Sequence, residues 1–184
     1  MALAVALLCS GLAAAEPPSY SEYQVKGAFL YNFAKLVDWK SVPPDSEEFV
    51  IAILGEDPFG EALDRTLGGR ELAGYPIRVR RINSLAELRD ARMLFVSRSE
   101  SDKLARVLGR LDGRCVLTVG DSPEFARSGG VIELFMRNQS VRFRVNMSAA
   151  ARAGLKLRPN LLRLAEIVEE DSSRAAPEPE STDD

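Results

Sequence analysis

Short apolar runs of strand length alternate along this chain with helix-start signals, and that alternation limits its fold more than any other feature. Phe49–Leu54, Met93–Val96 and Cys115–Val119 are almost wholly apolar, as is typical of strands buried on both faces of a sheet. Ile77–Ile82 largely alternates apolar and basic residues, so one of its faces should meet solvent. Strands that alternate with helices predict an α/β fold, namely a doubly wound, Rossmann-like and mostly parallel sheet with helices on both faces.

Capping residues and helix breakers predict where the helices begin and end. Ser21 and Gln24 have the spacing of a capping box, which should open a first helix that Pro43 stops. A last helix is predicted over Pro159–Val168, where apolar residues share one helical face. Between these two, side chains that can cap a helix N-terminus predict further helix starts at Asp57, Ser84, Ser99, Ser122 and Asn146.

An antiparallel β-hairpin is predicted close to the C-terminal end of the sheet. Val131–Met136 and Val141–Asn146 flank a short polar turn at residues 138–139. With this turn, apolar residues of both strands share one face and an ion pair can form on the other. The register pairs Met136 with Val141, Leu134 with Phe143, Ile132 with Val145 and Glu133 with Arg144.

The two ends of the chain differ in composition from its middle. Residues 1–15 form a mostly apolar run ending in three alanines, which predicts a cleaved secretory signal peptide and is shorter than the ~20 residues that span a membrane. Lipid attachment at Cys9 is the alternative, which the bulky Leu8 before it disfavours. Residues 169–184 hold seven acidic residues and one basic residue among few apolar ones, so we expect a disordered acidic tail. A single α/β domain is expected over residues 16–168.

Charge and residue usage exclude several classes of function. The formal net charge is −3 and the acidic tail contributes −6, so the rest of the chain carries +3, far from the footprint of a nucleic-acid-binding domain. The chain has no histidine, which excludes histidine acid–base catalysis, Ser-His-Asp triads and most zinc sites. Removal of a signal peptide would leave Cys115 without a disulfide partner, and we expect a buried thiol. We therefore expect no enzyme, no cofactor, no metal site and no nucleic-acid partner.

The predicted first helix carries more polar and aromatic residues than a core-covering helix needs. Val25, Phe29, Leu36 and, in part, Phe33 fall on one helical stripe that should face the core. The simpler explanation for the remaining aromatics is also burial in the core. Side chains that do not all fit the stripe are Tyr31, Asn32, Lys35 and Trp39.

This helix and a segment near the other end of the chain resemble the YfiR family of periplasmic regulators. The resemblance runs in order from Val25 to Ala165, through the loops and strands at residues 54–60, 94–100 and 116–119. The residues that carry it in the second segment are Val141-Arg142-Phe143, Asn146, Ala149-Ala150, Ala153-Gly154-Leu155, Leu161-Leu162 and Leu164-Ala165.

The resemblance implies a periplasmic protein that is a regulator and not an enzyme. Proteins of this kind bind the periplasmic part of an inner-membrane diguanylate cyclase and repress it, which lowers cyclic di-GMP and limits biofilm. An outer-membrane lipoprotein can sequester the repressor, and a homodimer is expected. The predicted partner or dimer contacts are Lys26, Tyr31, Asn32, Lys35 and Trp39 on the first helix, together with Arg142 and Arg144 on the hairpin.

A second function class remains open, because polar residues follow several predicted parallel strands. The carboxyl ends of such strands line the usual ligand crevice of an open α/β sheet. The alternative is thus a periplasmic small-molecule-binding sensor or carrier that acts with a histidine kinase or an outer-membrane receptor. A hydrolase on this fold is the least favoured reading, because no nucleophile motif is present. The predicted crevice residues are Asp57, Phe59, Ser97, Arg98 and Asp121.

Overall fold

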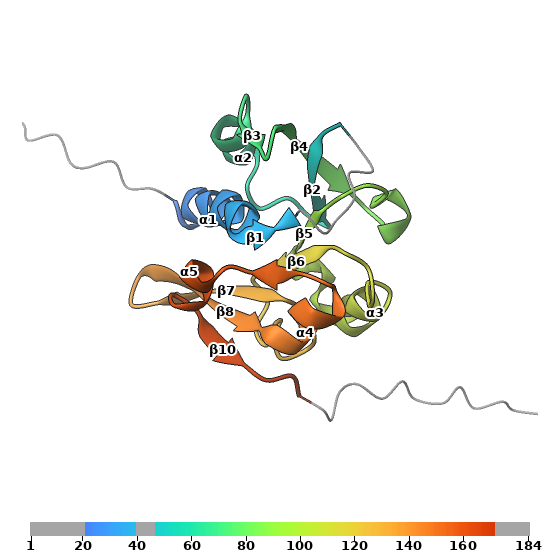
Figure 1. Ribbon diagram of the computed structural model, residues 1–184, viewed down its shortest axis with the longest axis vertical. Helices are drawn as coiled ribbons and strands as arrows, with labels where there is room; N and C mark the ends of the chain where they lie inside the picture. The colour runs from blue at the N-terminus through green and yellow to red at the C-terminus, as the bar shows by residue number, and fades with distance from the viewer. Residues whose placement is uncertain (1–20, 40–46, 172–184) are drawn as a thin grey trace, which may run out of the picture.

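The computed structural model describes residues 21–39 and 47–171, which form one eight-stranded mixed sheet flanked by helices (Figure 1). The strand order is β10-β8-β7-β6-β5-β2-β4-β3, and the predicted α/β class with a mostly parallel sheet is confirmed. A separate two-stranded ladder joins β1 to β9. The strands are β1 (Val37–Asp38), β2 (Phe49–Leu54), β3 (Glu71–Leu72), β4 (Tyr75–Ile82), β5 (Met93–Val96), β6 (Leu117–Gly120), β7 (Ile132–Arg137), β8 (Ser140–Asn146), β9 (Lys156–Leu157) and β10 (Glu166–Val168).

Helices cover both faces of the sheet, as predicted. α1, α2, α4 and α5 pack on one face, where they share a core with Ile51, Ile53 and Phe95. α3 and the 3₁₀ turn η2 pack on the other face against Val50 and Leu94. The helical elements are α1 (Glu22–Leu36), α2 (Glu61–Leu67), η2 (Leu85–Glu87), η3 (Arg98–Lys103), α3 (Leu104–Gly109), α4 (Met147–Arg152) and α5 (Pro159–Leu162).

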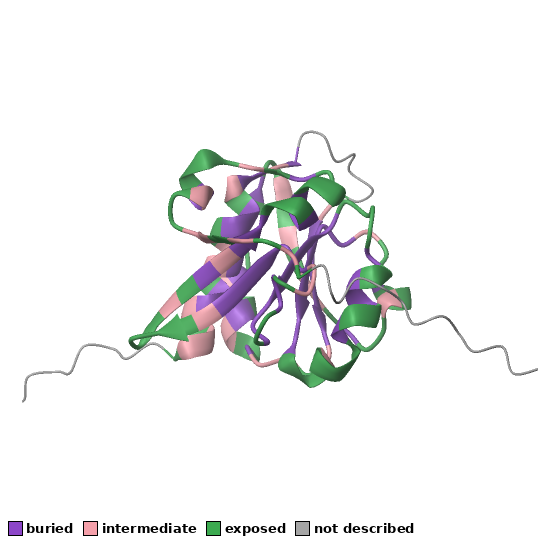
Figure 2. Cartoon of the chain, turned by 90° about the horizontal axis from the view of Figure 1, so that it is seen from below, coloured by how far each residue is buried: buried purple, intermediate pink, exposed green. Residues whose placement is uncertain are grey.

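The central strands are buried on both faces, which explains their continuous apolar sequences. All residues of β2, β5 and β6 are buried, and they form the inner slab of Figure 2. β4 alternates between exposed and half-buried residues over most of its length, in agreement with its predicted solvent face. Within the described residues, no helix is both long and apolar enough to cross a bilayer.

The predicted hairpin is confirmed in position and register. β7 and β8 pair antiparallel, with all four predicted cross-strand pairs in place. Phe143 points toward α1, where its ring centroid lies 5.0 Å from that of Phe33. Asn146 caps α4 as expected, because its side-chain oxygen accepts a hydrogen bond from Ala149 N at 2.9 Å.

The first helix begins where it was predicted and ends earlier. Ser21 and Gln24 form both hydrogen bonds of the capping box. The prediction that the helix continues to Pro43 is wrong, because Val37 and Asp38 leave it to form β1. The antiparallel partner that draws them out is β9, which lies more than 100 residues away along the chain.

Two predicted helix starts are wrong, because the side chain expected to cap the helix forms a different hydrogen bond. Asp57 does not cap α2, which begins after Gly60; its Oδ1 accepts from Phe59 N at 2.8 Å. Ser122 opens no helix, and residues 123–129 form successive turns. The Ser122 hydroxyl instead lies 2.9 Å from that of Ser101 in η3.

Three further predictions are corrected: the N-cap after β5, the length of the last helix and the burial of Cys115. Ser97, and not Ser99, is the N-cap of the helical segment after β5, which starts as 3₁₀ helix. The predicted helix over Pro159–Val168 stops at Leu162, because its last residues form β10 in parallel with β8. Cys115 is exposed and not buried, and it lies outside β6, which begins at Leu117.

A close approach of backbone to an aromatic ring fixes the turn after β6. The Phe125 ring is fully buried between Gly120 and Gly130, and a Cβ at either glycine would overlap it. Side chains at these two positions are therefore excluded unless the ring moves. This explains why the chain can fold back tightly between β6 and β7.

We expect Gly130→Ala to lower the free energy of unfolding by about 1–3 kcal/mol, because the added methyl group overpacks the core against Phe125. Gly109→Ala is the matched control, since a Cβ at Gly109 would meet nothing within 4 Å and alanine favours helix. Urea denaturation of both variants measures the difference. Equal stabilities would contradict the packing described here.

Candidate functional site

The carboxyl ends of β2, β5 and β6 meet at one edge of the sheet, where an open α/β fold holds its ligands. The chain passes from β2 to β4 on one side and then to β5 on the other, so the strand order reverses at β2. Such a reversal opens the crevice that ligands of doubly wound folds occupy. Asp57, Ser97 and Asp121 follow these three strands, as the sequence predicted.

In this protein the first helix fills that edge with a buried charged side chain. Lys26 on α1 has 0 % exposed surface, and its Nζ lies 2.6 Å from Asp121 Oδ2 and 2.5 Å from Glu22 Oε1. Tyr23 donates its hydroxyl hydrogen to the same Asp121 oxygen at 2.9 Å. We call Glu22, Tyr23, Lys26, Arg98 and Asp121 the edge cluster.

Asp121 is the centre of the edge cluster. Arg98 Nε donates to the Asp121 backbone oxygen at 3.0 Å and lies 3.4 Å from its Oδ2. Asp121 is 3 % exposed, and its second carboxylate oxygen, Oδ1, is buried and accepts no hydrogen bond within the described residues. Donors thus converge on one oxygen of a carboxylate that the fold has removed from water.

The environment of Asp121 changes the acidity of its tyrosine neighbour. Burial raises the pKa of Tyr23 to about 12, and the negative charge of Asp121 adds to the shift. Both effects disfavour the phenolate. Tyr23 therefore acts at this site as a hydrogen-bond donor and as an aromatic surface, with its ring 4.5 Å from Lys26 Nζ.

The structure brings together some of the predicted crevice residues and separates others. Arg98 and Asp121 are in direct contact, and Phe59 reaches them through Tyr23, whose ring centroid is 5.5 Å away. Ser97 is buried and caps η3. Asp57 turns to the next strand, where its Oδ2 accepts from Arg81 at 2.9 Å.

Two of the predicted partner contacts are wrong, because their side chains lie inside the domain. Lys26 belongs to the edge cluster and has no exposed surface. Trp39 is 7 % exposed; its Nε1 donates to Ala34 O at 2.6 Å and its ring packs on Phe49. Neither side chain can touch a partner while the domain keeps this conformation.

The other predicted contacts on α1 lie on its outer side. Asn32 and Lys35 are exposed, and Tyr31 is half-buried. The Tyr31 ring has Lys35 Nζ 5.3 Å from its centroid and the Arg70 guanidinium 4.8 Å from it. We call Tyr31, Asn32, Lys35 and Arg70 the α1 patch.

The two predicted arginines of the hairpin lie on the opposite face of the sheet. Phe143 points toward α1, so its neighbours Arg142 and Arg144 point away from it. Arg142 is exposed, whereas Arg144 binds Glu133 at 2.7 Å and stacks over Phe135. The hairpin arginines and the α1 patch therefore do not form one continuous surface.

Sequence reasoning missed Glu22 and Tyr23 as members of the edge cluster. Glu22 and Lys26 are four residues apart, which is the spacing of a helical ion pair and could have revealed the first of them. Nothing local reveals that Asp121 lies beside them, 95 residues from Lys26. In the part of the chain that the structure describes, no group of three or more acidic or thiol side chains could hold a metal ion.

Comparison with models of known families assigns the chain to a family. A family model described as YfiR/HmsC-like matches residues 23–166. The chain belongs to the YfiR/HmsC-like family. Members of this family are periplasmic regulators without catalytic activity, and the resemblance inferred from the sequence is confirmed.

Comparisons with individual proteins add less. No curated protein matches the chain. Among solved structures, it is similar to the ABC domain in complex with L-Trp from Streptococcus pneumonia, with a TM-score of 0.49 and 10% identity. The match covers 74% of this chain and 61% of that structure, so the chain spans about three-fifths of its length.

Removal of one partner from the buried ion pair should strongly destabilise the domain. We expect Lys26→Met to lower the free energy of unfolding by about 3–5 kcal/mol, because it removes the buried counter-ion of Asp121 and leaves only the more distant, largely exposed Arg98. Arg65→Met is the matched control, since Arg65 pairs with Glu61 on the exposed surface and should contribute within about 1 kcal/mol. Urea denaturation measures both.

A double-mutant cycle separates the ion pair from the packing of the lysine stem. Lys26→Met/Asp121→Asn should cost less than the sum of the two single changes, because the uncompensated charge is gone. If the costs of the single variants simply add, the two side chains do not interact.

The pKa of Tyr23 predicts a loss of stability in alkali. An unfolded tyrosine titrates near pH ~10, so below that pH both states keep the proton and the contribution of Tyr23 is complete. Between about pH 10 and the folded-state pKa of about 12, the unfolded state releases its proton first, and the folded state loses stability. We expect the free energy of unfolding to fall more steeply from about pH 9 to about pH 11.5 in the wild type than in Tyr23→Phe. Parallel profiles would show that the phenol is not shielded.

Proposed function

We propose that this protein is a periplasmic repressor that binds an inner-membrane signalling protein and holds it inactive. The partner that we propose first is a diguanylate cyclase. Its membership in the YfiR/HmsC-like family over residues 23–166 supports a regulatory role. A regulator of this kind acts by binding one state of its partner more tightly than the other. The cyclase would then make less cyclic di-GMP while the complex lasts.

One observation carries the choice of a protein partner over a small ligand. The edge of the sheet where doubly wound folds bind small molecules is filled by Lys26 and Tyr23 of the chain itself. These side chains already satisfy one oxygen of Asp121. Recognition is thus better supported at the outer surface than in the predicted crevice.

The exposed side of α1 has the features of a protein-binding surface. A groove of about 440 Å³ lies between α1 and α2, with Val25, Ala28 and Ala62 in its lining. Val25 and Ala28 continue along the helix to Asn32 and Lys35 at helical spacing. Small residues at the groove let another backbone approach closely, and the cations of the α1 patch favour an acidic partner surface.

The hairpin face offers a second surface on the same domain. Arg142 is exposed there and points away from α1. An outer-membrane lipoprotein that sequesters the repressor could compete for the α1 patch or bind at this face, and a homodimer would use one of them. The two surfaces can be tested separately because they lie on opposite sides of the sheet.

The test is binding of the purified protein to the periplasmic domain of a diguanylate cyclase from the same organism. We expect Asn32→Ala/Lys35→Glu to weaken the complex at least about tenfold, roughly 1.4 kcal/mol, without lowering the melting temperature. Arg142→Glu is the matched control, since it reverses an exposed charge on the opposite face. Calorimetry gives the affinities, and cyclic di-GMP measured in cells gives the functional readout.

Other outcomes of this experiment would change the assignment. Loss of binding in Arg142→Glu alone would move the contact surface to the hairpin. If the wild type binds no cyclase or other sensor domain, the repressor proposal is wrong. Thermal stabilisation by a metabolite, abolished by Arg98→Ala, would then favour the small-molecule sensor.

A further inference from the structure

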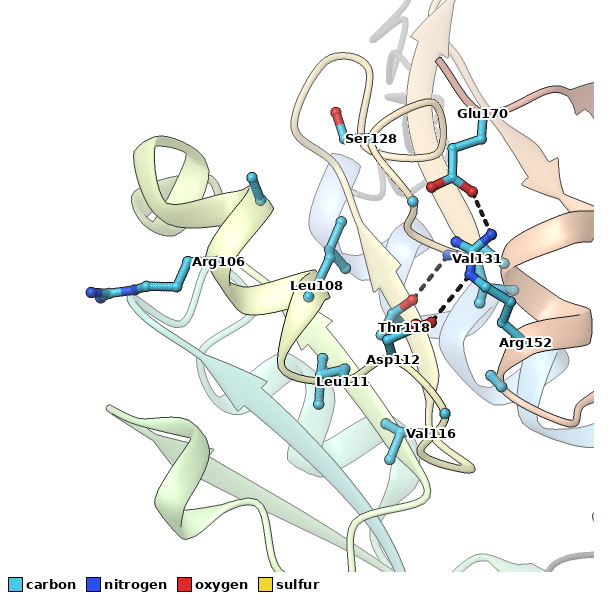
Figure 3. Close-up of a pocket in the computed structure, with 16 residues that line it drawn as sticks. Arg106, Leu108, Leu111, Asp112, Val116, Thr118, Ser128, Val131, Arg152 and Glu170 are labelled. Carbon is cyan, nitrogen blue, oxygen red and sulfur yellow. Dashed lines mark hydrogen bonds and ion pairs between the residues drawn. The ribbon is translucent and has the colours of Figure 1, made fainter. Parts of the chain in front are cut away.

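A large groove lies between α3 and α4, away from the edge cluster. It encloses about 820 Å³ and crosses the first residues of β6 (Figure 3). Val116 and Thr118 belong to its lining, and both come before the carboxyl end of β6, where Asp121 lies. The groove is therefore independent of the edge cluster and of the α1 patch.

The groove combines an apolar floor with a charged rim. Apolar side chains of its lining are Leu108, Leu111, Val116, Val131, Ala149 and Ala153. On the α4 side Arg152 bridges the rim, with its Nε 3.1 Å from Asp112 and its Nη1 2.6 Å from Glu170 (Figure 3). These contacts raise the pKa of Arg152, chiefly through the hydrogen bond to Glu170.

The opposite rim carries positive charge that has no counter-ion among the described residues. Arg106, Arg110 and Arg114 are exposed, and none forms an ion pair within the described residues. Arg106 lines the groove and projects outward from α3 (Figure 3). Arg110 and Arg114 each follow a glycine of the lining directly in the sequence. The α3 rim, as we call these three arginines, thus presents cations beside an apolar floor, and no described acid pairs with them.

The chain itself enters this groove at the start of its acidic tail. Glu170 lies in the lining and pairs with Arg152. The next residue, Asp171, donates its backbone N–H to Arg127 O at 3.0 Å. The described chain therefore ends at the rim of the groove, and 13 residues of the sequence, 172–184, follow Asp171.

We propose that residues 172–184 lie back across this groove and pair with the α3 rim. The segment starts with two serines, Arg174 and two alanines, and then carries Glu178, Glu180, Asp183 and Asp184. Its four acids and one base leave a net charge of −3, opposite to that of the α3 rim. Thirteen residues can extend to about 43 Å, several times the ~9 Å length of a six-residue helix such as α3. The acids can thus reach every arginine of the rim.

Covalent attachment makes this weak contact effective. Exposed ion pairs contribute little one at a time, but a tether that starts at the groove holds the acids at a high local concentration. The tail then shields an apolar groove that would otherwise remain open to other chains. An acidic segment of another protein could enter only by displacing it.

Cys115 provides a probe at the groove, because it is exposed and lies between Arg114 and Val116. In the full chain with Cys9→Ser it is the single cysteine and can carry a nitroxide. We expect the amide signals of residues 172–184 to lose at least half of their intensity by paramagnetic broadening at low salt. The intensity should return in about 0.5 M salt, which screens exposed charges.

Charge variants test which residues hold the tail. Arg106→Gln/Arg110→Gln/Arg114→Gln should restore the tail signals. The matched control, with the same number of charges removed elsewhere, is Arg65→Gln/Arg142→Gln/Arg163→Gln, which should leave the broadening unchanged. Undiminished tail signals in the otherwise unaltered labelled chain would overturn the proposal.

A mixing experiment distinguishes the chain's own tail from that of a second copy. Nitroxide-labelled protein without ¹⁵N is mixed with unlabelled ¹⁵N protein. The proposal predicts no broadening in the mixture, because the contact is within one molecule. Broadening of residues 172–184 there would assign the groove to a second copy and contradict the proposal.

Discussion

A lysine without exposed surface joins the first helix to the carboxyl edge of the sheet, and the position of every other side chain on that helix depends on it. Transfer of Lys26 and Asp121 out of water is costly, and their attraction offsets that cost only when the geometry is good. Here Asp121 also accepts from Tyr23, and Lys26 also binds Glu22. A rotation of α1 would separate these groups, so the pair fixes which face of the helix meets the sheet.

Because the ion pair fixes the rotation of α1 about its axis, one side of the helix packs on the sheet and the other faces solvent. Phe33 meets the hairpin at Phe143, while Asn32 and Lys35 face solvent. The same rotation places two side chains against the strand ends where this class of fold ordinarily binds a ligand. The family's regulatory role is consistent with our proposal that a partner binds on the outside of the domain.

The sequence predicted the elements whose signals are local, and it failed where distant segments decide. Continuous apolar runs located the buried strands, and alternation fixed the hairpin register because a shift by one residue would reverse both faces. Capping residues were weaker evidence: Ser21 and Asn146 cap helices, whereas Asp57 holds Arg81. β1 and β10 could not be predicted, because each depends on a strand elsewhere in the chain. For the same reason Lys26 was taken for a surface residue.

The outer edge of β4 has a consequence for how the domain meets other molecules. β3 pairs with only two of its eight residues, so most of that edge has no neighbouring strand among the described residues. Arginines at positions 78, 80 and 81 line it, and each is held by a carboxylate. Charged side chains of this kind oppose the addition of a foreign strand. Copies of this domain are thereby kept from joining edge to edge into an open-ended array.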